Sequence, residues 1–344
     1  MRKLRGTSLG AVLLIGLSAG GCARPQGVLF PVIDPPRIWP EPPDPPAIRL
    51  LGTLSDSGDL QAGQSGAEVF QAALRGSRPP IRLVGPQAIA VREDDVLAVA
   101  DGQGGAVHLI DLVHRTHTMV TGWGDERLGV PLGVTWVGNR LFVTDARRHE
   151  VIEANDRGEV LRQFGSDVLT RPVGIACLPG GDDLYVVDGG AHCVVRFDRT
   201  GREVGRWGKP GSGPGELNFP THLAVDGTGR IAVADSGNFR VQLFDTDGNY
   251  VSSFGSKGDA AGNFALPKGV GFDRAGHVYV VDAQFENVQI FDAQGRLLLA
   301  FGEEGNGLGQ FSLPAGLTID HHNRIWVADS GNRRLQVFAY VRDS

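Results

Sequence analysis

His149, His192 and His222 are the residues of this sequence best suited to metal chemistry. They fall in consecutive copies of a segment that repeats every 41 to 48 residues, so a repeating fold would bring them to one end of the molecule. Imidazole groups that converge in this way ligate zinc and similar ions. The set is therefore a candidate metal site, which would belong to a metal-dependent lyase or hydrolase. The alternative is that His149 and His192 are exposed loop residues and His222 is a hydrogen-bonded polar group. No cofactor besides such an ion is expected.

Large charged and aromatic side chains occupy neighbouring positions of the same copies and differ from one copy to the next. Together with the three histidines they form the predicted binding face: Arg147, Arg148, Phe239, Phe285, Glu286 and Arg333. Arginine and aromatic residues are favoured anchors at protein interfaces. The sequence therefore predicts a scaffold that binds a protein, peptide or ligand through one end, with drift between the repeats as the competing explanation.

Motifs of the common enzyme classes are missing from the repeats. The sequence contains no Cys-x-x-Cys, His-Glu-x-x-His or Gly-x-x-x-x-Gly-Lys-Ser/Thr, and its two Gly-x-Ser-x-Gly matches, Gly6–Gly10 and Gly16–Gly20, fall in the N-terminal segment outside the repeats. The formal net charge is −6, and an acidic chain repels phosphate backbones, so nucleic acid is not expected as a partner. These absences favour a binding protein over an enzyme.

The repeat predicts the fold class. Each copy contains four short runs rich in Val, Ile, Leu and Phe, separated by Gly, Asp and Asn, which is typical of hairpin-linked antiparallel strands. Four strands in about 45 residues make one blade of a β-propeller. The copies start at Pro86, Pro131, Pro172, Pro220, Pro267 and Pro314. Residues 47–344 are thus predicted to form an all-β, six-bladed β-propeller with four-stranded antiparallel blades.

One residue type recurs at the end of every second strand. The set consists of Asp101, Asp145, Asp188, Asp235, Asp282 and Asp329. An aspartate before a tight turn accepts hydrogen bonds from nearby backbone N–H groups, so we interpret these residues as turn caps rather than metal ligands. His321 and His322 fall in a turn at the opposite end of the ring and are interpreted as solvated.

The sixth copy stops after its third strand, Arg334–Phe338. Ile48–Gly52, within residues 47–55, resembles the outer strand of the other copies and is predicted to pair with Arg334–Phe338. This pairing would close the ring and remove two open sheet edges. Residues 64–76 carry apolar side chains on one side of a predicted short helix.

The repeat resembles a known family. Ala234–Phe244 and Ala328–Phe338 both read Ala-Asp-Ser-Gly-Asn-x-Arg-x-Gln-x-Phe, which resembles the NHL repeat, and the whole layout resembles bacterial NHL-repeat lipoproteins of unassigned role. The resemblance implies a six-bladed propeller and leaves the function open. Peptidylglycine amidating lyase, a related propeller, holds zinc with histidines at several Pro-His positions. This sequence has only one such histidine, His222, offset by one residue, which argues against that activity.

The N-terminal residues predict export. Met1–Arg5 is basic, Leu9–Leu17 is apolar, and small residues precede Cys22, as in a secretory signal. The site resembles the bacterial lipobox, with Ala19 where Leu is usual. We therefore predict a lipoprotein signal peptide at 1–21 and lipidation of Cys22. The protein would be extracytoplasmic and anchored to a bacterial membrane, with the outer membrane favoured because no Asp follows Cys22.

Residues 22–46 contain nine prolines and are predicted to form an extended tether. An envelope protein or peptide is the expected partner, with membrane contact through the lipid anchor. Cys177 and Cys193 are predicted to remain unpaired. A strand separates them in the blade, which places them about 9.6 Å apart, whereas a disulfide needs Cα atoms within about 7 Å.

Overall fold

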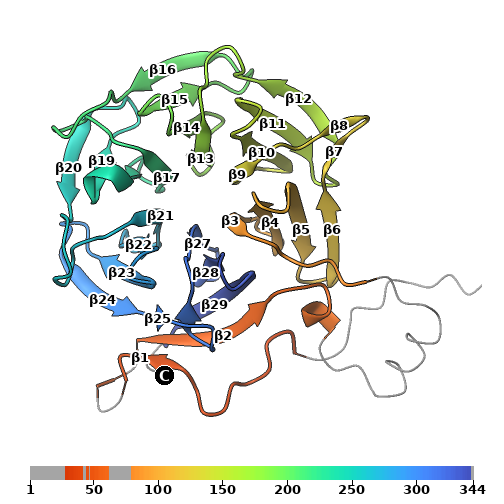
Figure 1. Cartoon of the computed structure of the whole chain (residues 1–344), viewed down its shortest axis with the longest axis vertical. Coiled ribbons are helices and arrows are strands. Elements are labelled where there is room, and N and C mark those ends of the chain that lie inside the picture. The colour runs from red at the N-terminus through yellow and green to blue at the C-terminus, as the bar shows by residue number, and fades with distance from the viewer. Residues whose placement is uncertain (1–27, 42–43, 46, 62–78, 342–344) are drawn as a thin grey trace, which may run out of the picture.

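A computed structural model describes residues 28–41, 44–45, 47–61 and 79–341 of the chain. Six antiparallel sheets radiate from a common axis, so the predicted all-β, six-bladed β-propeller is confirmed (Figure 1). In each blade the first strand lies nearest to the axis and the fourth lies outermost. No helix in the described ranges is long and apolar enough to cross a membrane.

The strands of each blade follow one another along the chain. Blades one and two comprise β3 (Pro86–Val91), β4 (Val96–Asp101), β5 (Ala106–Asp111), β6 (Thr116–Val120), β9 (Pro131–Val137), β10 (Arg140–Asp145), β11 (Glu150–Asn155) and β12 (Val160–Phe164). Blades three and four comprise β13 (Pro172–Cys177), β14 (Leu184–Asp188), β15 (Cys193–Phe197), β16 (Glu203–Trp207), β17 (Pro220–Val225), β18 (Ile231–Asp235), β19 (Arg240–Phe244) and β20 (Tyr250–Phe254). Blade five comprises β21 (Pro267–Phe272), β22 (Val278–Asp282), β23 (Asn287–Phe291) and β24 (Leu297–Phe301).

Blade six combines both ends of the described chain. It contains β27 (Leu317–Ile319), β28 (Arg324–Asp329), β29 (Arg334–Tyr340), β2 (Ile48–Leu54) and β1 (Ile38–Trp39). The smaller elements are η1 (Asp59–Gln61), η2 (Ser236–Asn238) and the pairs β7 (Gly122–Trp123) with β8 (Glu126–Arg127) and β25 (Glu303–Glu304) with β26 (Gln310–Phe311).

The burial of the strands follows their position in the blade. All five residues of β22 are buried because neighbouring blades cover both faces of the sheet, which explains its unbroken apolar run. The outer strand β20 instead exposes most of its residues and carries serines. The core is therefore a series of layers between blades rather than one central cluster.

The predicted closure of the ring is confirmed. β2 pairs antiparallel with β29, with Leu50 opposite Phe338 and Leu54 opposite Leu335. Leu50, Leu54 and Phe338 are buried, so the pairing seals the core of blade six as well as its backbone edge.

The N-terminal segment differs from the expected tether, because residues 28–41 pack against blade six. β1 pairs with β2 and adds a fifth strand. The Trp39 ring lies 5.7 Å from that of Phe338, and the Phe30 ring lies 6.1 Å from that of Trp326. Apolar side chains between the prolines thus cover the outer side of the blade. Residues 1–27, which include the predicted signal and Cys22, and the predicted helix at 64–76 lie outside the described residues.

The two described cysteines are free, as predicted. Cys177 pairs with Leu184 on one edge of β14, and Cys193 pairs with Asp188 on the other edge. The intervening strand therefore separates the thiols.

Candidate functional site

Every residue of the predicted binding face lies at one end of the ring, here called the loop end. This end carries the turns that follow each second strand and the loops that enter each innermost strand. The buried aspartates join the two: Asp188 accepts hydrogen bonds from Thr170 N–H at 2.6 Å, Arg171 N–H at 2.8 Å and Ala191 N–H at 3.1 Å. The interpretation of these aspartates as turn caps is confirmed, and each also holds the loop that enters its own blade.

The fourth residue after each aspartate has a left-handed backbone. The six φ angles run from 53° to 60°, at Gly105, His149, His192, Phe239, Glu286 and Arg333. A left-handed conformation costs a residue with a side chain about 1 kcal/mol or more, which only glycine avoids. Five blades therefore keep a large side chain where glycine would be more stable.

Three of these side chains bind the entry loop of the next blade. A ring N–H of His149 donates to Thr170 O, and His192 Nδ1 accepts from Phe219 N–H at 3.1 Å. Glu286 Oε1 accepts from Leu313 N–H at 3.1 Å. These contacts tie adjacent blades together, a structural role that the sequence did not reveal.

The candidate metal set His149, His192 and His222 does not converge. Each imidazole has its own partner, and His222 Nε2 lies 3.3 Å from Gln87 O. Among the described residues, the three histidines are not part of any cluster of metal-ligating atoms. The geometry therefore gives no support to a lyase or hydrolase metal at this end.

Of the other side chains of the binding face, some contact neighbouring residues and others are exposed to solvent. Arg148 pairs with Glu126 and Glu150 and lies over the Trp123 ring at 4.9 Å. Phe239 packs beneath the Lys257 ammonium at 5.1 Å. Phe285 is half-buried, whereas the exposed residues are Arg147 and Arg333.

The innermost strands of neighbouring blades pack closely against each other around the axis. A Cβ at Gly174 would lie 2.8 Å from His222 Cα, and one at Gly316 would lie 2.9 Å from Ala88 Cα. Glycine at these positions allows the backbones to approach. His222 is the only large polar side chain at the corresponding position of the six blades, and it closes the channel at the loop end.

A cavity of about 170 Å³ opens over His222 at the channel mouth. Its lining consists of Gln87, Leu132, Arg171, Val173, Gly189, Phe219, Pro220, Thr221, His222 and Lys268. No carboxylate lines the cavity, and neither Lys268 nor Arg171 forms a salt bridge within the described chain. Burial lowers the pKa of Lys268, since a charged ammonium loses hydration there. The cavity thus presents positive charge without a counter-charge.

His222 adds a hydrogen-bond acceptor to this cavity. Burial, assisted by nearby Lys268, lowers the pKa of His222 to about 4, so the ring is neutral at pH 7. Because a carbonyl can only accept, Nε2 donates its proton to Gln87 O and Nδ1 becomes the acceptor. The buried Nδ1 makes no well-formed hydrogen bond in the described structure, and the Lys268 carbonyl lies near the ring.

Two apolar side chains stand at the rim of the loop end. Phe219 is 59% exposed and Leu313 is 54% exposed, and their φ angles of 44° and 45° are left-handed. Sequence reasoning missed both, along with Lys268. The sequence could have drawn attention to Lys268, because it is the only charged residue at the second position of the six copies: Gln87, Leu132, Val173, Thr221, Lys268 and Ala315.

The NHL repeat model matches residues 217–244 and 311–338. These two segments are similar to the NHL repeat. They cover the first three strands of blades four and six, which are the two copies that the sequence singled out.

Solved structures of low sequence identity share the fold. A protein of unknown function from Bacteroides thetaiotaomicron is 18% identical, with a TM-score of 0.59 over 76% of this chain and 70% of the other. An auxiliary nutrient binding protein from the same organism is 15% identical, with the same TM-score and coverage. A gluconolactonase from Xanthomonas campestris is 18% identical, with a TM-score of 0.59 over 75% of this chain and 87% of the other. At these identities the likeness establishes the fold alone.

Proposed function

We propose that this NHL propeller is a binding protein of the bacterial cell envelope that receives a carboxylate of its partner at the channel mouth. The observation that carries the proposal is Lys268, a half-buried cation without a counter-charge in a cavity that no acidic residue lines. A buried charge is costly unless it is paired. A carboxylate from a partner would supply the counter-charge that Lys268 lacks within the described residues.

The size of the cavity favours a small part of a larger partner. Its 170 Å³ is below the 300–1,000 Å³ of common small-molecule sites and suits a single acidic side chain or a peptide C-terminus. Phe219 and Leu313 stand exposed at the same end, where an apolar part of the partner would cover them. The proposed partner is therefore a protein or peptide that combines a carboxylate with apolar side chains.

The envelope location rests on the N-terminal sequence. The basic start, the apolar Leu9–Leu17 and the small residues before Cys22 support export and lipidation. A lipid on Cys22 would hold the propeller at the membrane surface, with the outer membrane favoured.

Peptide binding to the Lys268→Met variant tests the proposed site. Fluorescent peptides with an apolar residue and a terminal carboxylate should bind the natural protein and bind the variant at least tenfold more weakly. Amidation of the peptide C-terminus should produce a similar loss if that carboxylate enters the cavity. Removing the half-buried charge should also raise the free energy of unfolding by roughly 1 kcal/mol, since an unpaired cation is destabilising.

The matched control is Lys209→Met. Lys209 is exposed and pairs with Glu216 at 3.3 Å, outside the cavity. This variant should bind the peptides as the natural protein does. Equal weakening in both variants, or equal affinity for acidic and amidated peptides throughout the panel, would overturn the assignment of the channel mouth.

A further inference from the structure

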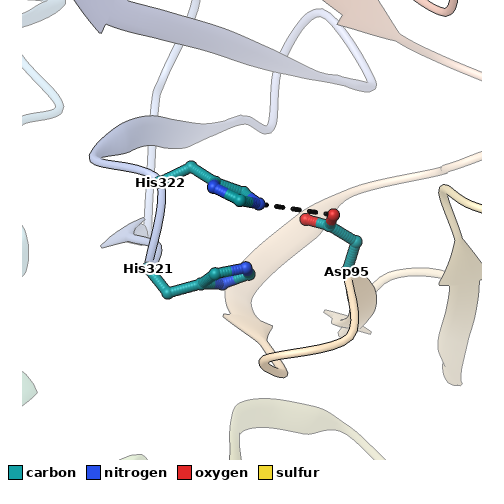
Figure 2. Close-up of side chains that lie close together, drawn as sticks. All are labelled: Asp95, His321 and His322. Carbon is teal, nitrogen blue, oxygen red and sulfur yellow. Dashed lines mark ion pairs between the residues drawn. The ribbon is translucent and has the colours of Figure 1, made fainter.

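We propose that Asp95, His321 and His322 form a zinc-binding site that links blades six and one at the end of the ring opposite the loop end. Asp95 lies in the turn between β3 and β4, and the two histidines lie in the turn between β27 and β28. Figure 2 shows both imidazoles directed from one turn toward the Asp95 carboxylate on the other. This juxtaposition replaces the interpretation of His321 and His322 as a merely solvated turn.

The distances between the ligand atoms suit a tetrahedral ion. One ligand atom from each residue lies within 4.8 Å of the other two, and His322 Nε2 is 3.5 Å from Asp95 Oδ2. Zinc binds imidazole nitrogen and carboxylate oxygen at about 2.0–2.1 Å, so two of its ligands are about 3.3 Å apart. The pair already has nearly this separation. His321 has to move by at most about 1.5 Å, which an exposed or half-buried side chain in a turn can do.

The charges around the cluster leave a negative site for the cation. Arg324 contacts Asp95 Oδ1 through Nη2, but its Nε also pairs with the buried Asp320 at 2.5 Å. One guanidinium is therefore shared by two carboxylates, and a single negative charge remains. The same contact leaves Oδ2 of Asp95 free to face His322. A hydrogen bond to the second oxygen of a ligating carboxylate is a common outer-shell arrangement in metal sites.

The backbone holds both turns in position. Asp95 N–H donates to Arg92 O at 3.0 Å, and Asp95 O accepts from Leu112 N–H at 3.1 Å. On the other turn, Asp320 Oδ1 accepts from His322 N–H at 2.8 Å and from Arg324 N–H at 2.9 Å. The ligands thus project from two fixed turns. A bound ion would therefore link blade six, which the N-terminal strand β2 completes, to blade one.

Titration of the purified, chelator-treated protein with zinc chloride tests the site. We expect one zinc ion per chain by calorimetry, with affinity reduced at least tenfold in each of His321→Ala and His322→Ala and abolished in the double variant. Zinc should raise the melting temperature of the natural protein, because it binds only the folded state, and should leave that of the double variant unchanged.

His277→Ala is the matched control. His277 occupies the corresponding turn of blade five, where its Nδ1 lies 2.8 Å from Asp273 Oδ2 without a second histidine. This variant should retain zinc affinity within twofold. Absence of stoichiometric binding, or the same loss in His277→Ala as in His322→Ala, would overturn the proposal. All variants are expected to keep the far-ultraviolet spectrum of the natural protein, since their side chains lie at the surface.

Discussion

His222 of blade four reaches Gln87 of blade one, the blade on the opposite side of the ring, with Nε2 3.3 Å from the Gln87 carbonyl oxygen. The bond bridges the channel where the six inner strands are already in contact. It also orients the ring so that Nδ1 makes no well-formed hydrogen bond inside the cationic cavity. The same side chain therefore stabilises the ring and shapes its candidate site.

Acid should destabilise the fold through two partly buried histidines, His117 and His222. Burial lowers the pKa of His222, with a smaller effect of Lys268, and the pKa of His117, with a smaller effect of His108, to about 4 from an ordinary value of 6.5. The unfolded chain therefore binds protons first as the pH falls. The contribution of each ring to stability is complete above pH 6.5 and is lost between pH 6.5 and pH 4, at no more than about 3 kcal/mol for each histidine. Urea denaturation at several pH values measures this loss.

Substitution separates the two contributions. His222→Gln and His117→Gln should each reduce the slope of stability against pH by roughly half. His114→Gln serves as the control, since His114 is exposed and pairs only with Asp111. A slope that stays unchanged in both His222→Gln and His117→Gln would contradict the assignment.

Trp39→Ala should lower the free energy of unfolding by about 2–3 kcal/mol. Trp39 lies against Phe301 and Phe338 and covers Gly309, so its removal opens the outer side of blade six. Thermal and urea melts provide the measurement. Val32→Ala, at a residue that is 95% exposed, should change stability little. Equal melting of both variants and the natural protein would mean that residues 28–41 behave as a free tether.

Arg333→Gly should stabilise the protein by about 1 kcal/mol. Arg333 has a φ of 57°, its side chain is exposed, and glycine adopts this conformation without strain. Chemical denaturation gives the free energy. If the loop end binds a partner, the same variant should weaken that binding while it raises stability. A loss of stability would show instead that the arginine side chain makes a contact that holds the turn.

Cys22→Ser should release the protein from the membrane fraction and leave the propeller folded. The reason is that lipidation would attach only at Cys22, whereas the described structure begins at Val28 and the ring closes through β2 and β29. Fractionation followed by a thermal melt of the soluble variant measures both effects. A variant that still sediments with membranes would exclude Cys22 as the anchor.

The sequence by itself determined the ring. The spacing of the copies predicted six blades, the recurring aspartates predicted the caps, and Ile48–Gly52 predicted the closing strand. Each inference worked because strand periodicity and turn chemistry are local properties, which the repeat presents several times over. Even the separation of Cys177 from Cys193 followed from strand order within one blade.

Only the tertiary structure decided which side chains meet. Asp95 and His322 are far apart in the chain and become neighbours because ring closure sets blade six beside blade one. His149 and His192 occupy the same position of two consecutive repeats, which suggested a common ion. In the structure each instead binds the loop that enters the next blade. Lys268 is a candidate binding residue only because no acidic residue is among the described residues that line its cavity. Contacts between blades depend on the angle and close packing of the whole ring, which no single repeat encodes.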